Sequence, residues 1–308
     1  MRVGVVRNPA SHANRRRRRP APDGDVIFAE APNAATMGEV LRDFARQEIG
    51  LLVLEGGDGS LRDMITALPA AFGAAPPLLA VMPAGKTNLL ARDLGLFSLD
   101  TLPLPKLLAE AKTGFRPERL KARRVLDICW SDGRHAPVSG FFFGAAAFRR
   151  ATILAQSVHR LGAFQRPAIA LTLISGFTRV LAGGSNDPWR AGETMTIALD
   201  GADPASGRRF VVLASTLKRF PLRMKPFDNG LGGLRYLEVD APPQRLGRAI
   251  ATLMSAEPAA WLGDYGYRRG SGDEMRLTLA EPFVLDGEIF PAGELIISAA
   301  RELQFVGP

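Results

Sequence analysis

The chain has 308 residues, which is long enough for two domains. Its residues are 46% hydrophobic and 23% charged, as in ordinary folded globular proteins. One cysteine, Cys129, excludes an intrachain disulfide framework, and three scattered histidines do not form the ligand pattern of a zinc site. The formal net charge of +8 indicates a polyanionic partner, such as a nucleotide, an anionic membrane surface or a nucleic acid. Because we find neither a signal-peptide pattern nor an apolar run long enough to span a bilayer, we expect a cytoplasmic location.

Apolar runs alternate with helix-like patterns over the first part of the chain. We expect strands and helices in turn: strands at residues 3–6, 26–29, 51–55 and 78–82, and helices at residues 36–48 and 103–112. Strand–helix alternation is typical of α/β proteins in which a parallel sheet carries helices on both faces. The sequence therefore predicts a doubly wound parallel α/β domain over residues 1–122.

The pattern of the sequence changes near Val125. Shorter apolar runs are interrupted by Gly, Pro and Asp, which is typical of an antiparallel β domain. We expect a helical segment within residues 154–181, a further helix at residues 245–254, and three strands at the end of the chain. A second, antiparallel β-rich domain is therefore predicted over residues 123–295.

Two turns that follow buried strands are the centre of the functional argument. The first is Gly56-Gly57-Asp58-Gly59-Ser60, and the second is Pro83-Ala84-Gly85-Lys86-Thr87-Asn88. Each turn leads into a helical pattern, and Ser60 with Asp63 fits a capping box. Helix N-termini at the carboxyl edge of a parallel sheet present free N–H groups, so both turns predict phosphate binding.

Asp58 is an unusual residue for a phosphate-binding turn. Because a carboxylate repels phosphate, its presence indicates a bound metal or a proton to be taken, with a local cap as the alternative. Residues 80–87 nearly match a P-loop, but Ala80 replaces the first glycine and Pro83 removes an N–H group, which argues against one. Glu55 ends its strand as in a Walker B segment, although apolar strands ending in an acidic residue are common.

Three further charged segments have structural interpretations of their own. Asp286-Gly287-Glu288 follows an apolar run and, taken alone, indicates a hairpin turn. Asp228, in the segment FDNG, is a turn residue or a metal carboxylate. The five arginines from Arg15 to Arg19 form a solvated loop or a clamp for phosphate and acidic lipid headgroups. Nucleic acid is not expected as a partner, because no aromatic residue between Met1 and Asp25 could stack on bases.

Taken together, these motifs resemble the catalytic domain of the diacylglycerol kinase family, especially the bacterial lipid kinases related to sphingosine kinases. The matching segments occur in order along most of the chain: NP at 8–9, GGDGS at 56–60, PAGKTNLLARDLG at 83–95, PFDNG at 226–230 and LDGE at 285–288. The resemblance implies a two-domain kinase that uses ATP and Mg²⁺ in the cleft between its domains. It also implies that residues 296–308 pack back on the first domain.

The resemblance assigns roles to particular residues. The nucleotide and its phosphates would be bound by Asn8, Gly56, Gly57, Asp58, Gly59, Ser60, Gly85, Lys86 and Asn88. Asp58, Asp286 and Glu288 are the candidate catalytic residues, with Asp286 or Glu288 as the general base, and Asp228 is the candidate metal ligand. The implied partners are a lipid substrate and an anionic membrane surface contacted by Arg15 to Arg19. The expected cytoplasmic location therefore includes peripheral association with the inner face of the membrane.

The chain departs from the family pattern at several positions. Lys86 stands where the family usually has threonine, so an ammonium group replaces a hydroxyl contact to phosphate. Arg62-Asp63 replaces an Asn-x-x-Glu-like continuation, and Asn229 removes one carboxylate from an Asp-Asp-Gly segment. These departures leave reduced kinase activity as an open alternative.

Three functions remain to be compared. The first is ATP-dependent transfer of the γ-phosphoryl group to the hydroxyl of a membrane lipid, diacylglycerol-like or sphingoid. The second is an NAD kinase-like phosphotransferase, which shares the GGDG turn and the two-domain plan, although the LDGE segment favours the lipid interpretation. The third is a non-catalytic, membrane-associated protein that binds lipid or nucleotide, which Lys86 and Asn229 suggest.

Overall fold

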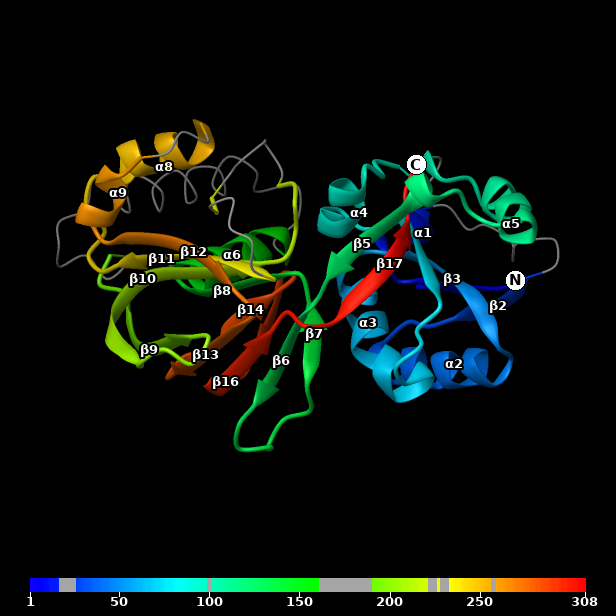
Figure 1. The fold of residues 1–308 in the computed structure, drawn as a ribbon, viewed down its shortest axis with the longest axis horizontal. Coiled ribbons are helices and arrows are strands. Elements are labelled where there is room, and N and C mark those ends of the chain that lie inside the picture. Colours follow the sequence, from blue (N-terminus) through cyan, green and yellow to red (C-terminus); the bar gives the residue numbers. More distant parts are fainter. Residues whose placement is uncertain (17–25, 99–100, 161–189, 221–225, 228–232, 256–258) are drawn as a thin grey trace.

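The protein consists of two lobes, each built on its own sheet (Figure 1). The computed structural model describes residues 1–16, 26–98, 101–160, 190–220, 226–227, 233–255 and 259–308. The first lobe contains the elements from β1 to β5 together with the last strand, β17, and the second lobe contains the elements from β6 to β16.

The first lobe is a mostly parallel sheet with strand order β2-β1-β3-β4-β17-β5, in which only β5 runs antiparallel to its neighbour. Helices α2 and α3 cover one face, and α4 and α5 lie on the other (Figure 1). Its strands are β1 (Arg2–Arg7), β2 (Ile27–Glu30), β3 (Ile49–Gly56), β4 (Leu78–Pro83), β5 (Leu120–Arg124) and β17 (Glu302–Val306). Its helices are α1 (His12–Arg16), α2 (Ala34–Arg46), α3 (Asp58–Phe72), α4 (Leu89–Leu94), α5 (Leu104–Thr113) and the short η2 (Pro117–Arg119).

The second lobe is an antiparallel sheet with the order β15-β14-β8-β10-β9-β13-β16-β6-β7, and β11 pairs with both β10 and β12. Its first strands are β6 (Leu126–Trp130), β7 (Val138–Gly140), β8 (Phe142–Ala146), β9 (Glu193–Leu199), β10 (Ala205–Ser215) and β11 (Leu234–Asp240). The later strands are β12 (Tyr267–Gly272), β13 (Glu274–Leu279), β14 (Phe283–Leu285), β15 (Glu288–Phe290) and β16 (Gly293–Ser298). The described helices are α6 (Ala147–Arg160), α8 (Leu246–Ser255) and α9 (Trp261–Asp264).

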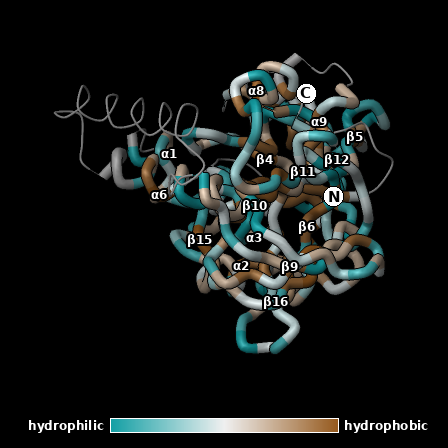
Figure 2. Tube along the Cα trace, turned by 90° about the vertical axis from the view of Figure 1, so that its left-hand side faces the viewer, coloured by the Kyte–Doolittle hydropathy of each residue, from teal (hydrophilic) through white to brown (hydrophobic). Residues whose placement is uncertain are grey.

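Each lobe has a hydrophobic core of its own. The strands β1, β3 and β4 are almost continuously buried, as expected for parallel strands with helices on both faces. The apolar segments gather in the interior around β4 and β6, and hydrophilic segments lie outside (Figure 2). In the second lobe β13 alternates buried and exposed residues, as expected for an antiparallel strand with one face on the core.

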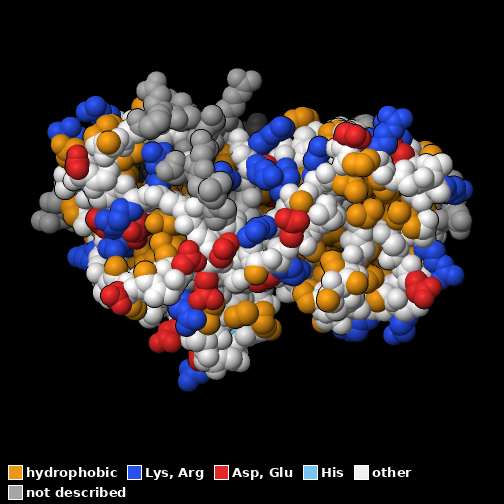
Figure 3. Space-filling view, in the orientation of Figure 1, with side chains coloured by type: hydrophobic (Ala, Val, Ile, Leu, Met, Phe, Trp, Pro, Cys, Tyr) orange, Lys and Arg blue, Asp and Glu red, His pale blue; other side chains and the backbone are white. Residues whose placement is uncertain are grey.

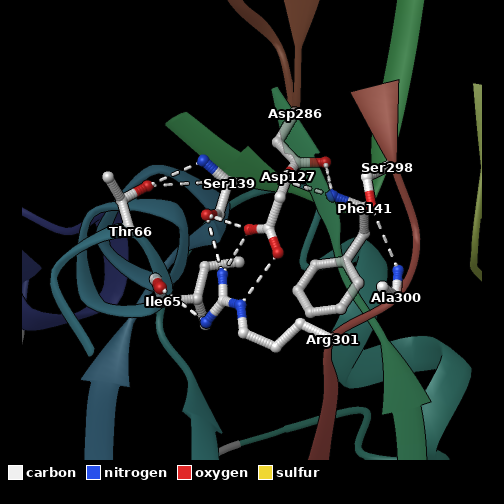
Figure 4. A network of polar contacts seen from close by, with 9 residues as sticks. All are labelled: Ile65, Thr66, Asp127, Ser139, Phe141, Asp286, Ser298, Ala300 and Arg301. Atoms are coloured by element: carbon white, nitrogen blue, oxygen red, sulfur yellow. Dashed lines mark hydrogen bonds and ion pairs between the residues drawn. The ribbon is translucent and has the colours of Figure 1, made fainter. Parts of the chain in front are cut away.

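Two chain segments connect the lobes side by side. Val125, between β5 and β6, donates its N–H group to the carbonyl oxygen of Arg301, between β16 and β17, at 2.9 Å. The Arg301 guanidinium binds Asp127 of β6, Ser139 of β7 and, at 3.1 Å, the carbonyl oxygen of Ile65 in α3 (Figure 4). This polar network attaches the second lobe to α3, the helix that begins at the GGDGS turn.

The predicted fold class is confirmed: a parallel α/β sheet is followed by an antiparallel β-rich unit. The predicted strands and helices of the first 122 residues all occur, with ends shifted by a few residues. Residues 273–306 contain five strands, β13 to β17, instead of three, because Pro282, the two-residue turn at Asp286 and Pro291 each interrupt the strand pattern. The division into residues 1–122, 123–295 and 296–308 stays a prediction. Of the helical segment expected at 154–181, residues 161–181 lie outside the described part.

Candidate active site

The first turn places Asp58 at the N-terminus of a long helix. β3 ends at Gly56, Gly57 is the N-cap of α3, and Asp58 is the first helical residue. Gly57 has no side chain that could cap the helix, so the N–H groups of the first turn are available to a ligand. The capping box predicted for Ser60 and Asp63 is wrong, because the helix begins two residues before Ser60. This arrangement suits an anion, since the helix dipole adds positive potential at the same point.

The second turn is closed by the side chain of Asn88. Its Oδ1 accepts from the Gly85 N–H and its Nδ2 donates to the Gly85 carbonyl oxygen, both at 2.9 Å. Asn88 has φ = 52°, a left-handed conformation that asparagine tolerates better than most residues. Lys86 and Thr87 are exposed at the tip of the turn. The Asn88 amide therefore shapes the turn, and the Lys86 ammonium group is left facing solvent.

The two turns lie in contact. A Cβ atom added to Gly57 would lie 2.9 Å from the Gly85 Cα atom, and one added to Gly85 would lie 2.7 Å from the Gly57 Cα atom. Asp58 Oδ1 accepts from the Leu89 N–H at 2.7 Å and so caps α4. Both glycines are required because no side chain fits between the two backbones. The capping alternative for Asp58 is therefore realised toward α4.

Asn8 joins the end of β1 to the first turn. Its Nδ2 donates to Ser60 Oγ at 2.7 Å, and its Oδ1 accepts from the Ala10 N–H at 2.8 Å. Asn14 Nδ2 donates to the carbonyl oxygens of Asn8 and Glu55, at 2.9 and 3.1 Å. The carboxyl ends of β1, β3 and β4 thus form one hydrogen-bonded edge. Asn14, in the short helix α1, was not predicted as a site residue, because no recognisable motif surrounds it.

The second lobe contributes Asp286 through the β14–β15 hairpin. Asp286 and Gly287 have φ values of 48° and 85°, as in the two-residue turns typical of hairpins. The Asp286 carboxylate accepts from the N–H groups of Phe141 and Phe142, at 2.9 to 3.2 Å. The hairpin interpretation is thus confirmed, and the turn also fixes the carboxylate against the backbone between β7 and β8 (Figure 4).

The carboxylates of the two lobes influence each other. The pKa of Asp286 is raised to about 7, first by burial and then by the negative charge of Asp58, against the opposing effect of the Phe141 and Phe142 N–H groups and Arg62. Burial also raises the pKa of Asp58, although the Leu89 and Asn88 N–H groups oppose it. A carboxylate whose pKa lies near 7 can accept and release a proton at neutral pH.

Arg62 is a site residue that the sequence marked only as a departure from the family pattern. It lies one helical turn after Asp58, its side chain is only 8% exposed, and its Nη1 pairs with Glu288 Oε2 at 2.7 Å. Its Nη2 pairs with Asp63 Oδ1 at 2.7 Å. The i,i+4 spacing from Asp58 was the available signal, because it places both side chains on one face of α3.

Two other predicted residues have different outcomes. Glu55 pairs with Arg7 Nε at 2.5 Å in the interior of the first lobe, so it has a structural partner and no Walker B role is indicated. Asp228, the candidate metal ligand, lies outside the described residues. Within the described part of the chain, no group of three or more Asp, Glu, His or Cys side chains could hold a metal ion.

No described helix has the length and apolar character needed to cross a bilayer.

A family model described as the diacylglycerol kinase catalytic domain matches residues 12–114, which include both turns. Two structures of a proposed diacylglycerol kinase from Bacillus anthracis share the fold with TM-scores of 0.65, at 15% and 14% identity. A third, a diacylglycerol kinase from the same organism, has a TM-score of 0.57 at 13% identity. Each comparison covers 100% of this chain and 97% of the other.

No curated protein sequence matches the chain. The predicted resemblance, which was based on sequence motifs, is nevertheless confirmed by the family model and agrees with the fold. The first lobe carries the sequence pattern of the diacylglycerol kinase catalytic domain over residues 12–114, and the whole chain has the fold of the diacylglycerol kinases to which it is similar.

Proposed function

We propose that the protein is a lipid kinase that transfers the γ-phosphoryl group of ATP to the hydroxyl of a membrane lipid, diacylglycerol-like or sphingoid. One observation carries this proposal: the ion pair of Arg62 in α3 with Glu288 in β15, at 2.7 Å, joins the helix that begins at Asp58 to the hairpin of Asp286, whose pKa is raised to about 7 by burial and by the charge of Asp58. A base with this pKa stands beside an uncapped helix N-terminus suited to phosphate. The match with the diacylglycerol kinase catalytic domain supports the lipid kinase family.

The phosphates of ATP fit the edge formed by the two turns. The N–H groups at the start of α3 supply hydrogen bonds, and the exposed Lys86 supplies a positive charge. The Asp58 carboxylate lies at the same edge as these N–H groups and would fit Mg²⁺, which is commonly held by one or two carboxylates together with substrate phosphates. When bound, Mg²⁺ supplies positive charge that offsets the charge on the phosphate oxygens.

The proton of the lipid hydroxyl passes to Asp286. As the hydroxyl oxygen bonds to the γ-phosphorus, the bond from that phosphorus to the β,γ-bridging oxygen breaks and ADP leaves. The N–H groups of Phe141 and Phe142 hold the Asp286 carboxylate in place while it accepts the proton. This role requires the ionised carboxylate, so turnover should rise as the pH rises through about 7.

Basic side chains near the lobe junction support binding at an anionic membrane surface. The Arg219 N–H donates to Asp93 Oδ1 at 2.6 Å, which places the exposed Lys218 and Arg219 beside α4 and its exposed Arg92. Lys and Arg side chains gather in this part of the molecule (Figure 3). Each such residue contributes roughly 1 kcal/mol near an anionic surface. Arg15 is exposed, and residues 17–19 lie outside the described part of the chain.

Asp58→Asn tests the proposed function. Asparagine keeps an oxygen that can accept from the Leu89 N–H, so the turn should remain intact while the negative charge is lost. We expect lipid phosphorylation to fall by about 100-fold or more, as for loss of a charged group acting on the phosphoryl transfer. The measurement is transfer of labelled phosphate from ATP to lipid vesicles, with NAD as a parallel acceptor.

The outcomes separate the three functions. Labelled NAD with unlabelled lipid would support the NAD kinase-like alternative and contradict the lipid kinase. Binding of ATP and vesicles by the unaltered protein without any transfer would support a non-catalytic protein. Full lipid turnover by Asp58→Asn would remove Asp58 from the mechanism. Unchanged circular dichroism is the control for folding.

Lys86→Met tests the departure from the family pattern. We expect the KM for ATP to rise by about tenfold with a smaller change in kcat, because a point charge on the phosphates acts on the ground state and transition state alike. The effect should shrink in high salt, since Lys86 is exposed. Lys86→Thr, which restores the usual residue of the family, is the matched variant. An unchanged KM in both variants would show that position 86 does not contact ATP.

A further inference from the structure

Helix α3 contains a proline in its interior. The helix runs from Asp58 to Phe72, and Pro69 is an exposed residue in its C-terminal half. Proline has no N–H group, so Pro69 cannot donate to the carbonyl oxygen of Ile65, four residues earlier. Its ring also crowds that carbonyl and kinks the helix there. The Ile65 carbonyl oxygen therefore needs a donor from outside the helix.

Arg301 supplies this donor from the segment that returns the chain to the first lobe, between β16 and β17. Its Nη1 donates to the Ile65 carbonyl oxygen at 3.1 Å. Its Nε and Nη2 donate to the two carboxylate oxygens of Asp127 in β6, at 2.9 and 2.5 Å (Figure 4). The side chains of Arg301 and Asp127 are only 22% and 29% exposed. One guanidinium thus joins α3 of the first lobe to β6 of the second.

Ser139 of β7 joins the same helix to the second lobe beside Arg301. Its N–H donates to Thr66 Oγ1 at 2.9 Å, and its Oγ accepts from Arg301 Nη2 at 2.8 Å. β7 ends one residue before Phe141, whose N–H holds the Asp286 carboxylate. The C-terminal half of α3 is therefore fixed against the strand that leads to the hairpin, while the N-terminus of α3 is the GGDGS turn.

We propose that Arg301 is a positioning residue that acts together with Pro69 to fix α3 against the second lobe. The two residues act as one unit, because Pro69 frees the carbonyl oxygen that Arg301 binds. The orientation of α3 decides how the phosphate-binding turns of the first lobe meet the hairpin of the second. The expected effect on turnover rests on the proposed function, whereas the effect on the arrangement of the lobes does not.

Pro69→Ala separates this role from a merely structural one. Alanine restores the helical N–H and draws the Ile65 carbonyl back along the helix, and the exposed position leaves no cavity. We expect Tm to stay the same or rise. At the same time kcat should fall by about three- to fivefold, because a small misplacement of the reacting groups is costly. A merely structural residue would not separate kcat from Tm in this way.

Arg301→Gln removes the guanidinium itself. We expect kcat for transfer of labelled phosphate from ATP to phosphatidylcholine vesicles containing diacylglycerol to fall by about tenfold or more. The KM for ATP should change by less than about twofold, because both phosphate-binding turns belong to the first lobe. Arg301→Lys keeps the charge without the planar fork and should recover part of the loss.

Arg124→Gln is the matched control. It removes an arginine from an exposed pair with Asp273, at the other segment that crosses between the lobes, and should leave kcat unchanged. A loss as large as that of Arg301→Gln would show that any arginine at the crossing has this effect, and would contradict a specific role for the bond to α3.

The double variant shows whether Pro69 and Arg301 act through one contact. In Pro69→Ala/Arg301→Gln we expect the same kcat as in Arg301→Gln alone, since the bond that Pro69→Ala weakens is already absent. Losses that multiply would mean that the two residues act independently, and would overturn the proposal.

The distance between the lobes gives a readout that does not depend on turnover. Cys129, the single cysteine of the chain, is exposed on β6, and Glu39 is exposed on α2. Spin labels on Cys129 and on Glu39→Cys should show a broader distance distribution after Pro69→Ala and after Arg301→Gln, and no change after Arg124→Gln.

An unchanged distance distribution in both variants, or an unchanged kcat in Pro69→Ala, would overturn the proposal. Should the unaltered protein transfer no phosphate to lipid, the proposed function fails, and the distance distribution alone decides the role of Arg301.

Discussion

Asp286→Asn is expected to lower lipid phosphorylation by about 10² to 10⁴-fold and at the same time to stabilise the folded protein at alkaline pH. The loss of turnover follows from the removal of the general base. Asparagine retains an oxygen that can accept from the N–H groups of Phe141 and Phe142, so the hairpin should remain in place. The measurements are phosphate transfer to lipid vesicles and unfolding in urea at several pH values.

The gain in stability follows from the direction of the pKa shift. The pKa of Asp286 is raised from 3.8 to about 7, so between about pH 4 and pH 7 the folded state holds a proton that the unfolded state has released. Stability therefore falls across that window and stays low above it. The carboxylate is buried against the Phe141 and Phe142 N–H groups, but Asp286 as a residue is partly exposed, so screening by solvent reduces the cost to about 2 kcal/mol at pH 8, which Asp286→Asn should regain.

The pH dependence provides the control for this prediction. The stabilisation should shrink toward pH 4, where the native carboxyl group is protonated, and Asp203→Asn at an exposed position should change stability little at any pH. Lower stability of Asp286→Asn at pH 8 would contradict the assigned shift. Unchanged turnover would contradict the assignment of the base.

Glu55→Gln is expected to destabilise the protein by about 3 to 5 kcal/mol, a large part of the stability of a typical domain. Arg7 and Glu55 face each other on the neighbouring strands β1 and β3, and their side chains are only 8% and 3% exposed. Glu55→Gln removes the negative charge that faces the buried Arg7 guanidinium, whose carbon also lies 4.9 Å from the centre of the Phe28 ring. Urea unfolding near neutral pH measures the change.

Two variants decide whether the effect comes from the buried charge. Glu274→Gln breaks an exposed pair with Arg276 and should cost less than about 1 kcal/mol. The double variant Arg7→Met/Glu55→Leu removes both charges and should recover much of the loss, because apolar residues of similar volume can replace a buried ion pair. A double variant as unstable as Glu55→Gln would indicate that the hydrogen bonds at the strand ends, and not the charge, are responsible.

The order of strands, turns and helices in the first lobe could be predicted because each element depends on residues that are close together in the sequence. A continuous apolar run that ends in Gly56-Gly57 or Pro83 specifies a buried strand followed by a turn. The same local reasoning failed for Ser60, whose hydroxyl accepts from Asn8 and does not cap α3. It failed because α3 begins two residues earlier, at Asp58, so Ser60 lies inside the helix and cannot be its N-cap.

The sequence by itself determined the α/β and β-rich order of the chain and singled out Asp58, at a glycine-rich turn after a buried strand. Asp286 became a candidate only through the family resemblance, since its own segment indicates a hairpin turn. Only the tertiary structure decided their environment. The contact of Gly57 with Gly85, the cap that Asp58 places on Leu89 and the pairing of Arg62 with Glu288 join residues far apart in the chain. Burial and the nearness of other charges set a pKa, and neither has a local sequence signal. The base near pH 7 at the centre of the proposed function is therefore a property of the folded arrangement.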